Sequence, residues 1–127
     1  MEWIAVVTVL ALVEFLWLGI RVGSARGTYE VKAPATTGNP IFERHYRVHY
    51  NTLEQLVVFL PALWLFGTYV SGGIGALIGV VFLVGRILYA FAYVADPEKR
   101  SAGFMLTFVP SVILLLGGLL GALKAAF

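Results

Sequence analysis

The sequence predicts an all-α integral membrane protein, a left-handed bundle of four membrane-spanning helices. Hydrophobic residues make up 60% of the 127 residues and charged residues only 13%, whereas a soluble domain is about a quarter charged. A chain this short cannot bury so much apolar surface within itself, so lipid must cover the remainder. We therefore expect a single four-helix domain over residues 1–127, with the left-handed packing that most transmembrane bundles adopt.

Three of the helices follow from apolar runs close to the ~20 residues that cross a bilayer. They are expected over about residues 3–22, 74–95 and 103–124. The first run is preceded only by Met1 and Glu2, without the Lys or Arg that opens a signal peptide. We therefore expect the first helix to stay in the mature protein and not to be cleaved as a signal peptide.

The second helix is informative because its apolar part is too short to cross the bilayer by itself. Residues 56–70 are 15 residues long, or about 22 Å of helix against a ~30 Å hydrocarbon core. To span, the helix must begin earlier and carry Asn51 and Glu54 to membrane depth, where we expect them to be shielded from lipid. Asn39 as N-cap and Pro40 at the first helical position predict a helix over about 40–70.

The distribution of basic residues predicts the orientation in the membrane. The connections over residues 21–39 and 96–100 lie on the same side of the bundle. That side holds the larger set of cations: Arg21, Arg26, Lys32, Arg44, Arg47, Lys99 and Arg100. The opposite side has only Lys124. The positive-inside rule therefore predicts that the first and third connections are cytoplasmic and both termini lie outside, in a bacterial inner membrane.

Composition also excludes several classes of function. The net charge of +2 is small, and no basic run with interleaved aromatic residues indicates nucleic-acid binding. The absence of cysteine excludes disulfides, thiolate metal sites and a cysteine nucleophile. His45 and His49 have the spacing of metal ligands, but they lie opposite the Arg47 face and no third ligand is evident, so we expect no metal.

Polar residues gather on two predicted helix faces near the basic end of the bundle. On the second helix, spacings of three, four and three residues place Arg44, Arg47, Asn51 and Glu54 on one face. On the third helix, the same spacing rule brings together Arg86, Tyr89 and Tyr93, and Arg100 follows after a short link. Charged residues at membrane depth are costly, so they face the bundle interior and often mark a site.

Two interpretations of these faces are open. Arg47, Glu54 and Arg86 could form an ion network that only fixes helix packing. The arginines outnumber the acids, however, which favours an anionic ligand, with tyrosine hydroxyls as neutral donors. Glu14, near mid-bilayer, could pair with Arg86, carry a proton or pair between subunits, with a packing role favoured.

The start of the second helix carries a family resemblance. The run Phe42-Glu43-Arg44-His45-Tyr46-Arg47-Val48-His49-Tyr50-Asn51-Thr52-Leu53-Glu54 resembles the pattern F-E-R-x-x-R-x-x-x-N-x-x-E of the MAPEG family, the membrane-associated proteins in eicosanoid and glutathione metabolism. The run Phe59-Leu60-Pro61-Ala62-Leu63-Trp64 and the third-helix pattern from Gly85-Arg86 to Arg100 also fit. The resemblance covers essentially the whole chain.

The resemblance implies a homotrimer that holds glutathione between neighbouring subunits near the cytosolic face. The glutathione contacts it implies are Arg47, Asn51, Glu54, Tyr89 and Tyr93, with Arg26 reaching in from the adjacent subunit. The implied catalytic residue is Arg100, which would stabilise the glutathione thiolate. Ser101, in an arrangement similar to that of the prostaglandin synthase of the family, would help to hold it. Glutathione carries two carboxylates and one ammonium, a pattern that cationic forks and the single acid Glu54 suit.

The function implied is a glutathione-dependent transferase or peroxidase acting on lipophilic electrophiles or lipid hydroperoxides, a detoxification role. Gly27 stands where the leukotriene synthase of the family has a second arginine, and Gln55 replaces a tyrosine. Both departures favour general conjugation or hydroperoxide reduction over eicosanoid chemistry. The alternatives are a non-catalytic lipid-binding or scaffold protein of the same fold, which the intact Arg47, Asn51, Glu54 and Arg100 set disfavours, and a small four-helix exporter.

Overall fold

The computed structural model describes residues 1–127 as four long helices with no strand. The helices are α1 (Glu2–Tyr29), α2 (Pro40–Tyr69), α3 (Gly72–Ala95) and α4 (Ser101–Ala126), with a short 3-10 turn η1 (Pro97–Lys99) before α4. All four are long and apolar enough to cross a membrane. The prediction of an all-α membrane bundle is confirmed.

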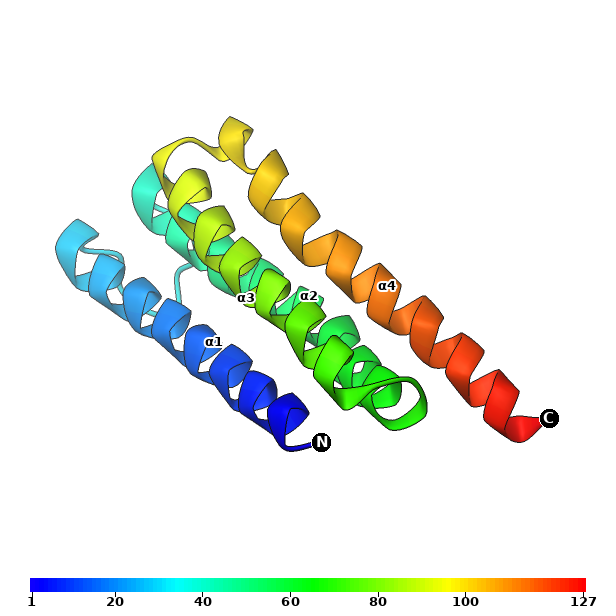
Figure 1. The fold of residues 1–127 in the computed structure, drawn as a ribbon. Coiled ribbons are helices and arrows are strands. Elements are labelled where there is room, and N and C mark those ends of the chain that lie inside the picture. The colour runs from blue at the N-terminus through cyan, green and yellow to red at the C-terminus, as the bar shows by residue number, and fades with distance from the viewer.

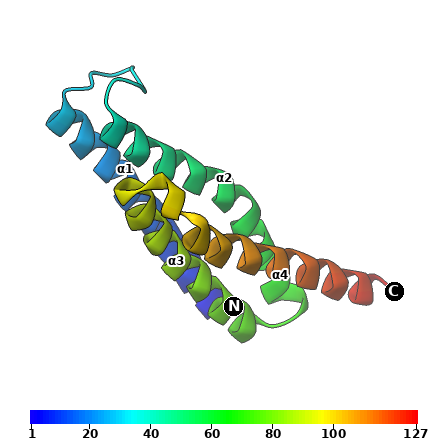
Figure 2. The ribbon, with the colours of Figure 1, turned by 90° about the horizontal axis from the view of Figure 1, so that it is seen from above.

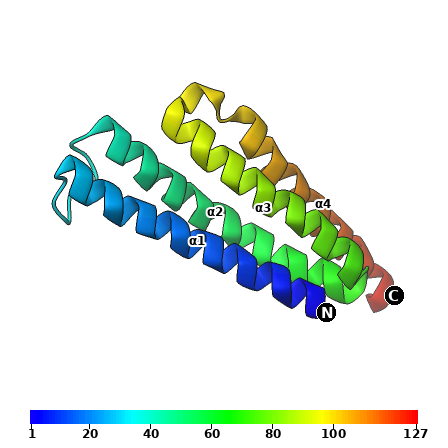
Figure 3. The ribbon, with the colours of Figure 1, turned by 60° about the vertical axis from the view of Figure 1, so that its left-hand side comes forward.

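The connections divide between the two ends of the bundle. Figure 1 shows the α1–α2 loop and the α3–α4 link at one end, and the α2–α3 turn with both termini at the other. The views in Figure 2 and Figure 3 agree with this arrangement. The basic residues of the first and third connections therefore lie at one end of the molecule, opposite Lys124.

The largest apolar core runs through the half of the bundle away from the basic end. Its centre is the stacked pair of Phe59 on α2 and Phe82 on α3, whose ring centroids are 3.7 Å apart. Ile4 of α1 and Leu114 of α4 belong to the same cluster of 11 residues, and these four side chains are fully buried. The outer faces carry large exposed apolar side chains, as expected where lipid provides the surroundings.

The first helix is longer than the sequence predicted. We expected it to end near residue 22, with Arg21–Asn39 as a loop, but α1 continues to Tyr29 and Glu30 closes it in the left-handed conformation. The two glycines in this stretch cost about 1 kcal/mol each relative to alanine. Packing offsets that cost, because Val22 and Ala25 are buried against Phe42 in a separate, smaller core.

The start of α2 is confirmed at Pro40. The side chain of Asn39 accepts hydrogen bonds from the backbone N–H groups of Ile41 and Phe42 at 2.9 and 3.0 Å, which satisfies donors that an uncapped helix would leave free. At the same end, Arg44 donates to the last carbonyl groups of α3, at 3.0 Å to Val94. The basic end of α2 is thereby fixed against α3.

The two remaining helices also begin earlier than predicted. The Ser71 hydroxyl accepts a hydrogen bond from the N–H of Ile74, so α3 begins at Gly72 and not at 74. Helix α4 begins at Ser101 and not at 103. The second shift matters for function, because it places Ser101 in the first turn of a helix.

Candidate functional site

The main polar pocket lies between α2, α3 and α4 at the basic end of the bundle. Its volume is about 610 Å³, within the range of roughly 300–1,000 Å³ usual for small-molecule sites. The residues lining it are Arg47 and Asn51 of α2, Tyr89 and Tyr93 of α3, Arg100, and Ser101, Phe104 and Met105 of α4. Two of these residues are cationic and none is acidic, so the pocket suits an anionic ligand.

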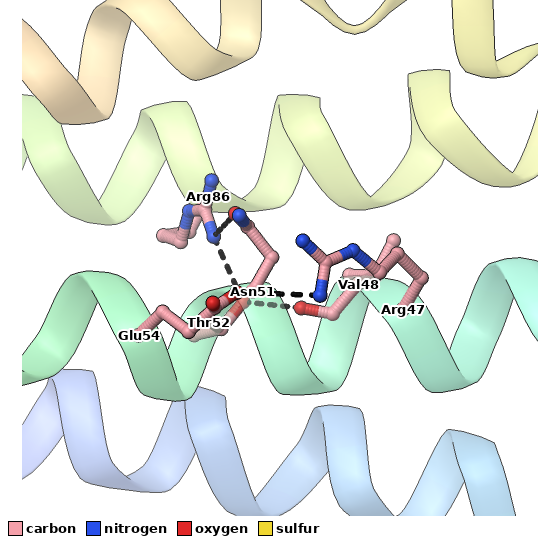
Figure 4. Close-up of polar contacts among 6 residues, drawn as sticks. All are labelled: Arg47, Val48, Asn51, Thr52, Glu54 and Arg86. Atoms are coloured by element: carbon pink, nitrogen blue, oxygen red, sulfur yellow. Dashed lines mark hydrogen bonds and ion pairs between the residues drawn. The ribbon is translucent and has the colours of Figure 1, made fainter.

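On α2, Arg47 and Glu54 form an ion pair, with 3.4 Å between Nη1 and Oε1. They lie two helical turns apart on the face predicted from their spacing (Figure 4). About half of each side chain is exposed, at 50% and 48%. The single chain therefore leaves Glu54 half-exposed, and its shielding from lipid stays a prediction, whereas Asn51 is half-buried and lines the pocket.

Beneath the pocket, Arg86 of α3 is fully buried and connects three helices. Its Nη1 donates to Asn51 Oδ1 at 2.9 Å and to Thr52 Oγ1 at 3.0 Å (Figure 4). Its Nη2 donates to Thr107 Oγ1 of α4 at 3.4 Å. No acid pairs with it, so Arg86 does not belong to the ion network with Arg47 and Glu54 that was one of the two open interpretations. Hydroxyl and amide oxygens solvate the charge instead.

Glu14 does not pair with Arg86 either. It is half-buried and lies in a groove between α1 and α3, among Trp17, Leu83 and Phe91. Of the roles open for Glu14, the pairing with Arg86 is therefore not the one found.

The two tyrosines of α3 form one wall of the pocket. Tyr89 is buried and Tyr93 is half-buried, and their ring centroids are 5.5 Å apart. The guanidinium of Arg86 lies 4.2 Å from the centre of the Tyr89 ring, a cation–π contact. Gly103 of α4 allows this wall to form, because a Cβ at that position would lie 2.6 Å from the Cα of Tyr89.

The beginning of α4 forms another part of the pocket wall. Arg100 is the N-cap residue of α4, is exposed, and its Nη1 donates to the carbonyl of Pro97 at 2.8 Å. No side chain caps the helix, and its first backbone bond runs from the N–H of Phe104 to the carbonyl of Arg100. The N–H groups of the first turn and the positive end of the helix dipole therefore lie beside the Ser101 hydroxyl.

Arg26 lies apart from this pocket in the single chain. It is in the last turn of α1 and not in a loop, which corrects the sequence prediction. Its Nη1 donates to the carbonyl of Ala35 at 2.7 Å, and its guanidinium lies 4.8 Å from the centre of the Phe42 ring. Within the single chain Arg26 therefore stabilises the α1–α2 loop.

Comparison with known proteins establishes the family. Residues 4–120 match the MAPEG family. The chain belongs to the MAPEG family. It is 36% identical to human microsomal glutathione S-transferase 2 over 118 residues, which cover 93% of this chain and 80% of that protein.

Two further MAPEG relatives come from a mammal and a cyanobacterium. Leukotriene C4 synthase of the guinea pig, Cavia porcellus, is 37% identical over 99 residues, 78% of this chain and 66% of the relative. An uncharacterized protein of the cyanobacterium Synechocystis is 54% identical over 121 residues, 95% of this chain and 88% of the relative.

Two lining residues were not predicted from the sequence. Phe104 and Met105 give the MAPEG pocket an apolar wall on α4. Nothing distinguishes them from the other apolar residues of this helix except spacing, since they lie three and four positions after Ser101. Once α4 is known to begin at Ser101, that spacing places all three on one face.

Proposed function

We propose that this protein is a membrane-bound, glutathione-dependent transferase or peroxidase that acts on lipophilic electrophiles or lipid hydroperoxides. The observation that carries the proposal is that six of the residues expected from the family resemblance line one and the same pocket. These residues are Arg47, Asn51, Tyr89, Tyr93, Arg100 and Ser101. The relatives named above, a glutathione S-transferase and a leukotriene C4 synthase, support the same class of chemistry.

Different residues in and beside the pocket match different chemical groups of glutathione. The Arg47 fork matches the geometry of a carboxylate, and the neighbouring Glu54 is the acid able to receive the ammonium group. Asn51 accepts from Arg86 through its oxygen, so its NH₂ group remains to donate to the ligand. Tyr89 and Tyr93 add hydroxyl groups on the other wall.

The sulfur of glutathione is assigned to the beginning of α4. An ordinary thiol has a pKa of about 8.5, and only its thiolate is a strong nucleophile. The Arg100 guanidinium, the Ser101 hydroxyl and the free N–H groups of the first turn all favour the anion. Arg100 would leave the Pro97 carbonyl to contact the sulfur.

The thiolate then attacks the second substrate. In conjugation, the sulfur forms a bond to an electrophilic carbon, and the leaving group departs with the bonding electron pair. In peroxide reduction, two glutathione molecules are oxidised to the disulfide as the hydroperoxide is reduced to an alcohol and water. Phe104 and Met105 provide the apolar side of the pocket that a lipophilic substrate would contact.

The proposed assembly is a homotrimer with the site between subunits. The exposed Arg47–Glu54 pair supports it, because the apolar run that follows, residues 56–70, is only 15 residues long and α2 must carry the pair into the membrane. A neighbouring subunit would cover the pair and bring its own Arg26 close. We also propose a bacterial inner membrane, with the α1–α2 and α3–α4 connections in the cytoplasm.

Titration of the purified protein with glutathione, followed by thiolate absorbance in the ultraviolet, tests the function. We expect saturable thiolate formation near neutral pH. S-Methylglutathione should compete for the site without producing the signal. Binding of glutathione without any thiolate would contradict the enzyme and support the non-catalytic alternative. The oligomeric state measured on the same sample tests the trimer.

A further inference from the structure

A second polar pocket lies between α1 and α2 and shares no residue with the candidate site. Its volume is about 190 Å³, and the residues lining it are Arg21, Ser24, Ala25, Thr28 and Tyr29 of α1 and His45 of α2. We propose that this pocket binds the headgroup of an anionic phospholipid, with its phosphate on Arg21 and an acyl chain along the groove between α1 and α3.

The first argument is the environment of the Arg21 charge. Its guanidinium lies against two neighbouring aromatic rings, 5.0 Å from the centre of Trp17 and 4.9 Å from that of Phe91. Its Nη1 is buried and has no hydrogen-bond partner in the protein, and Arg21 belongs to neither ion pair. A buried N–H group without an acceptor is costly, and Arg21 lines the pocket, where a phosphate oxygen would supply an acceptor to its guanidinium.

The second argument is depth in the membrane. The apolar run of α1 from Trp3 to Ile20 is 18 residues long, which is about 27 Å of helix. That length nearly crosses the ~30 Å hydrocarbon core. Arg21 follows at once, so it lies at the level where lipid phosphates are found, with Trp17 one turn deeper as an interfacial aromatic residue.

The third argument is the continuity of the headgroup pocket with an apolar groove. Trp17 and Phe91, the two rings that hold Arg21, also line a groove of about 500 Å³ between α1 and α3. Along α1 the stripe Leu10, Val13, Trp17, Arg21, Ser24 and Thr28 has helical spacing, passing from apolar to cationic to hydroxyl side chains. A phospholipid has the same order of acyl chain, phosphate and polar headgroup.

The side chains around Arg21 also select the type of headgroup. None of the six lining residues is acidic, so the pocket offers nothing to pair with a choline or ethanolamine cation. Ser24, Thr28 and Tyr29 present hydroxyl groups that can donate to and accept from the hydroxyls of a glycerol headgroup. Glu14 is the one acid in the groove, and it lies about 10 Å along the helix from Arg21. Phosphatidylglycerol therefore fits better than a zwitterionic lipid.

The test measures lipid retention by the full chain in native mass spectrometry, after reconstitution with equal amounts of phosphatidylglycerol and phosphatidylcholine. We expect the wild type to retain phosphatidylglycerol preferentially. Arg21→Gln should weaken that binding about tenfold or more, because a charge-assisted hydrogen bond to phosphate is lost. The matched control Lys32→Gln removes the same charge from the nearby exposed loop and should change binding by at most a few-fold.

A second variant separates the pocket from the charge and from any effect on folding. Ser24 is exposed on α1, so Ser24→Leu should fold while it fills the headgroup space and leaves Arg21 in place. It too should lose phosphatidylglycerol. Equal retention of the two lipids by the wild type, unchanged in Arg21→Gln, would overturn the proposal. Thermal stabilisation by inorganic phosphate as large as that by phosphatidylglycerol would overturn the assignment to a lipid.

Discussion

The Nη1 of Arg86 donates a 2.9 Å hydrogen bond to the side-chain oxygen of Asn51, so a fully buried cation of α3 fixes the orientation of an amide that lines the pocket. The same nitrogen donates to Thr52, and the other terminal nitrogen donates to Thr107 on α4. Because arginine has only donors, Asn51 must present its oxygen to Arg86 and its NH₂ group elsewhere. The first prediction follows from this relationship.

Replacing Arg86 by lysine should weaken glutathione binding as well as the fold. A lysine ammonium keeps the charge but cannot contact α2 and α4 together as a planar fork does. With the amide of Asn51 no longer fixed, we expect the Kd for glutathione to rise about tenfold, which corresponds to ~1.4 kcal/mol. Isothermal titration in detergent measures the Kd, and the Tm reports the stability.

Thr107→Val is the matched control for Arg86→Lys. It removes the weakest contact of Arg86, at 3.4 Å, and leaves the bond to Asn51. We expect a loss of stability of about 1 kcal/mol with the Kd unchanged. A Kd that rises in both variants in proportion to their loss of Tm would mean that Arg86 acts on stability alone.

Gly103→Ala should disturb the pocket through the backbone. The added methyl would lie 2.6 Å from the Cα of Tyr89, so α3 and α4 must separate. Overpacking of this kind costs about 1–3 kcal/mol. It would also displace Tyr89 from the pocket wall, so we expect a lower Tm together with weaker glutathione binding. Gly73→Ala is the control, because nothing lies within 4 Å of its added methyl; equal effects of the two variants would refute the packing argument.

Glu54→Gln should leave stability nearly unchanged and weaken binding of one part of glutathione. A half-exposed ion pair such as Arg47–Glu54 contributes about 0–1 kcal/mol to folding. If Glu54 receives the ammonium of glutathione, the variant should lose affinity for glutathione but not for an analogue lacking that amino group. A double-mutant cycle over the two proteins and the two ligands measures the coupling. A coupling energy near zero would remove Glu54 from the site.

Much of the fold follows from the sequence because the bilayer imposes lengths on its helices. The 15-residue apolar run of α2 requires an early start, and Asn39 with Pro40 marks it. The end of α1 does not follow in the same way, because Gly23 and Gly27 are residues typical of a loop. The buried spacing of Leu18, Val22 and Ala25 indicated a continuing helix, but only the contact with Phe42 shows why that spacing matters.

The candidate site was predictable where its residues share one helix. The spacing of Arg47 and Asn51 places both on the face that lines the pocket. Contacts between helices were not predictable in the same way. Arg86 was grouped with the tyrosines, yet its partners are hydroxyl and amide groups of α2 and α4 that no spacing rule connects. From the sequence, Arg21 is only one of the cations of the first connection. Its pocket forms because α1 extends beyond it, which the sequence did not predict.

The last prediction separates the roles of Arg47 and Arg100. Arg47 lies on α2 beside Asn51 and is paired with Glu54, which suits holding a charged end of glutathione. Arg100 lies across the pocket at the uncapped beginning of α4, next to Ser101, where the sulfur is assigned. Arg47→Ala should therefore chiefly raise the Kd for glutathione, because a carboxylate loses its fork in a partly desolvated site.

Arg100→Ala should instead act on the thiol. Without the guanidinium, the pKa of the bound thiol should return toward its ordinary value of about 8.5. The thiolate forms as the pH rises through that pKa. The rise in kcat with pH should therefore move to higher pH in Arg100→Ala, and the difference in kcat between this variant and the wild type should shrink in alkaline solution. Arg100→Lys should restore part of the activity, because charge matters there more than bidentate geometry. The pH–rate profile and the glutathione Kd of each variant decide the matter. An unshifted profile in Arg100→Ala, with a loss of affinity equal to that of Arg47→Ala, would make Arg100 a second binding residue and leave the thiolate to the N–H groups of α4.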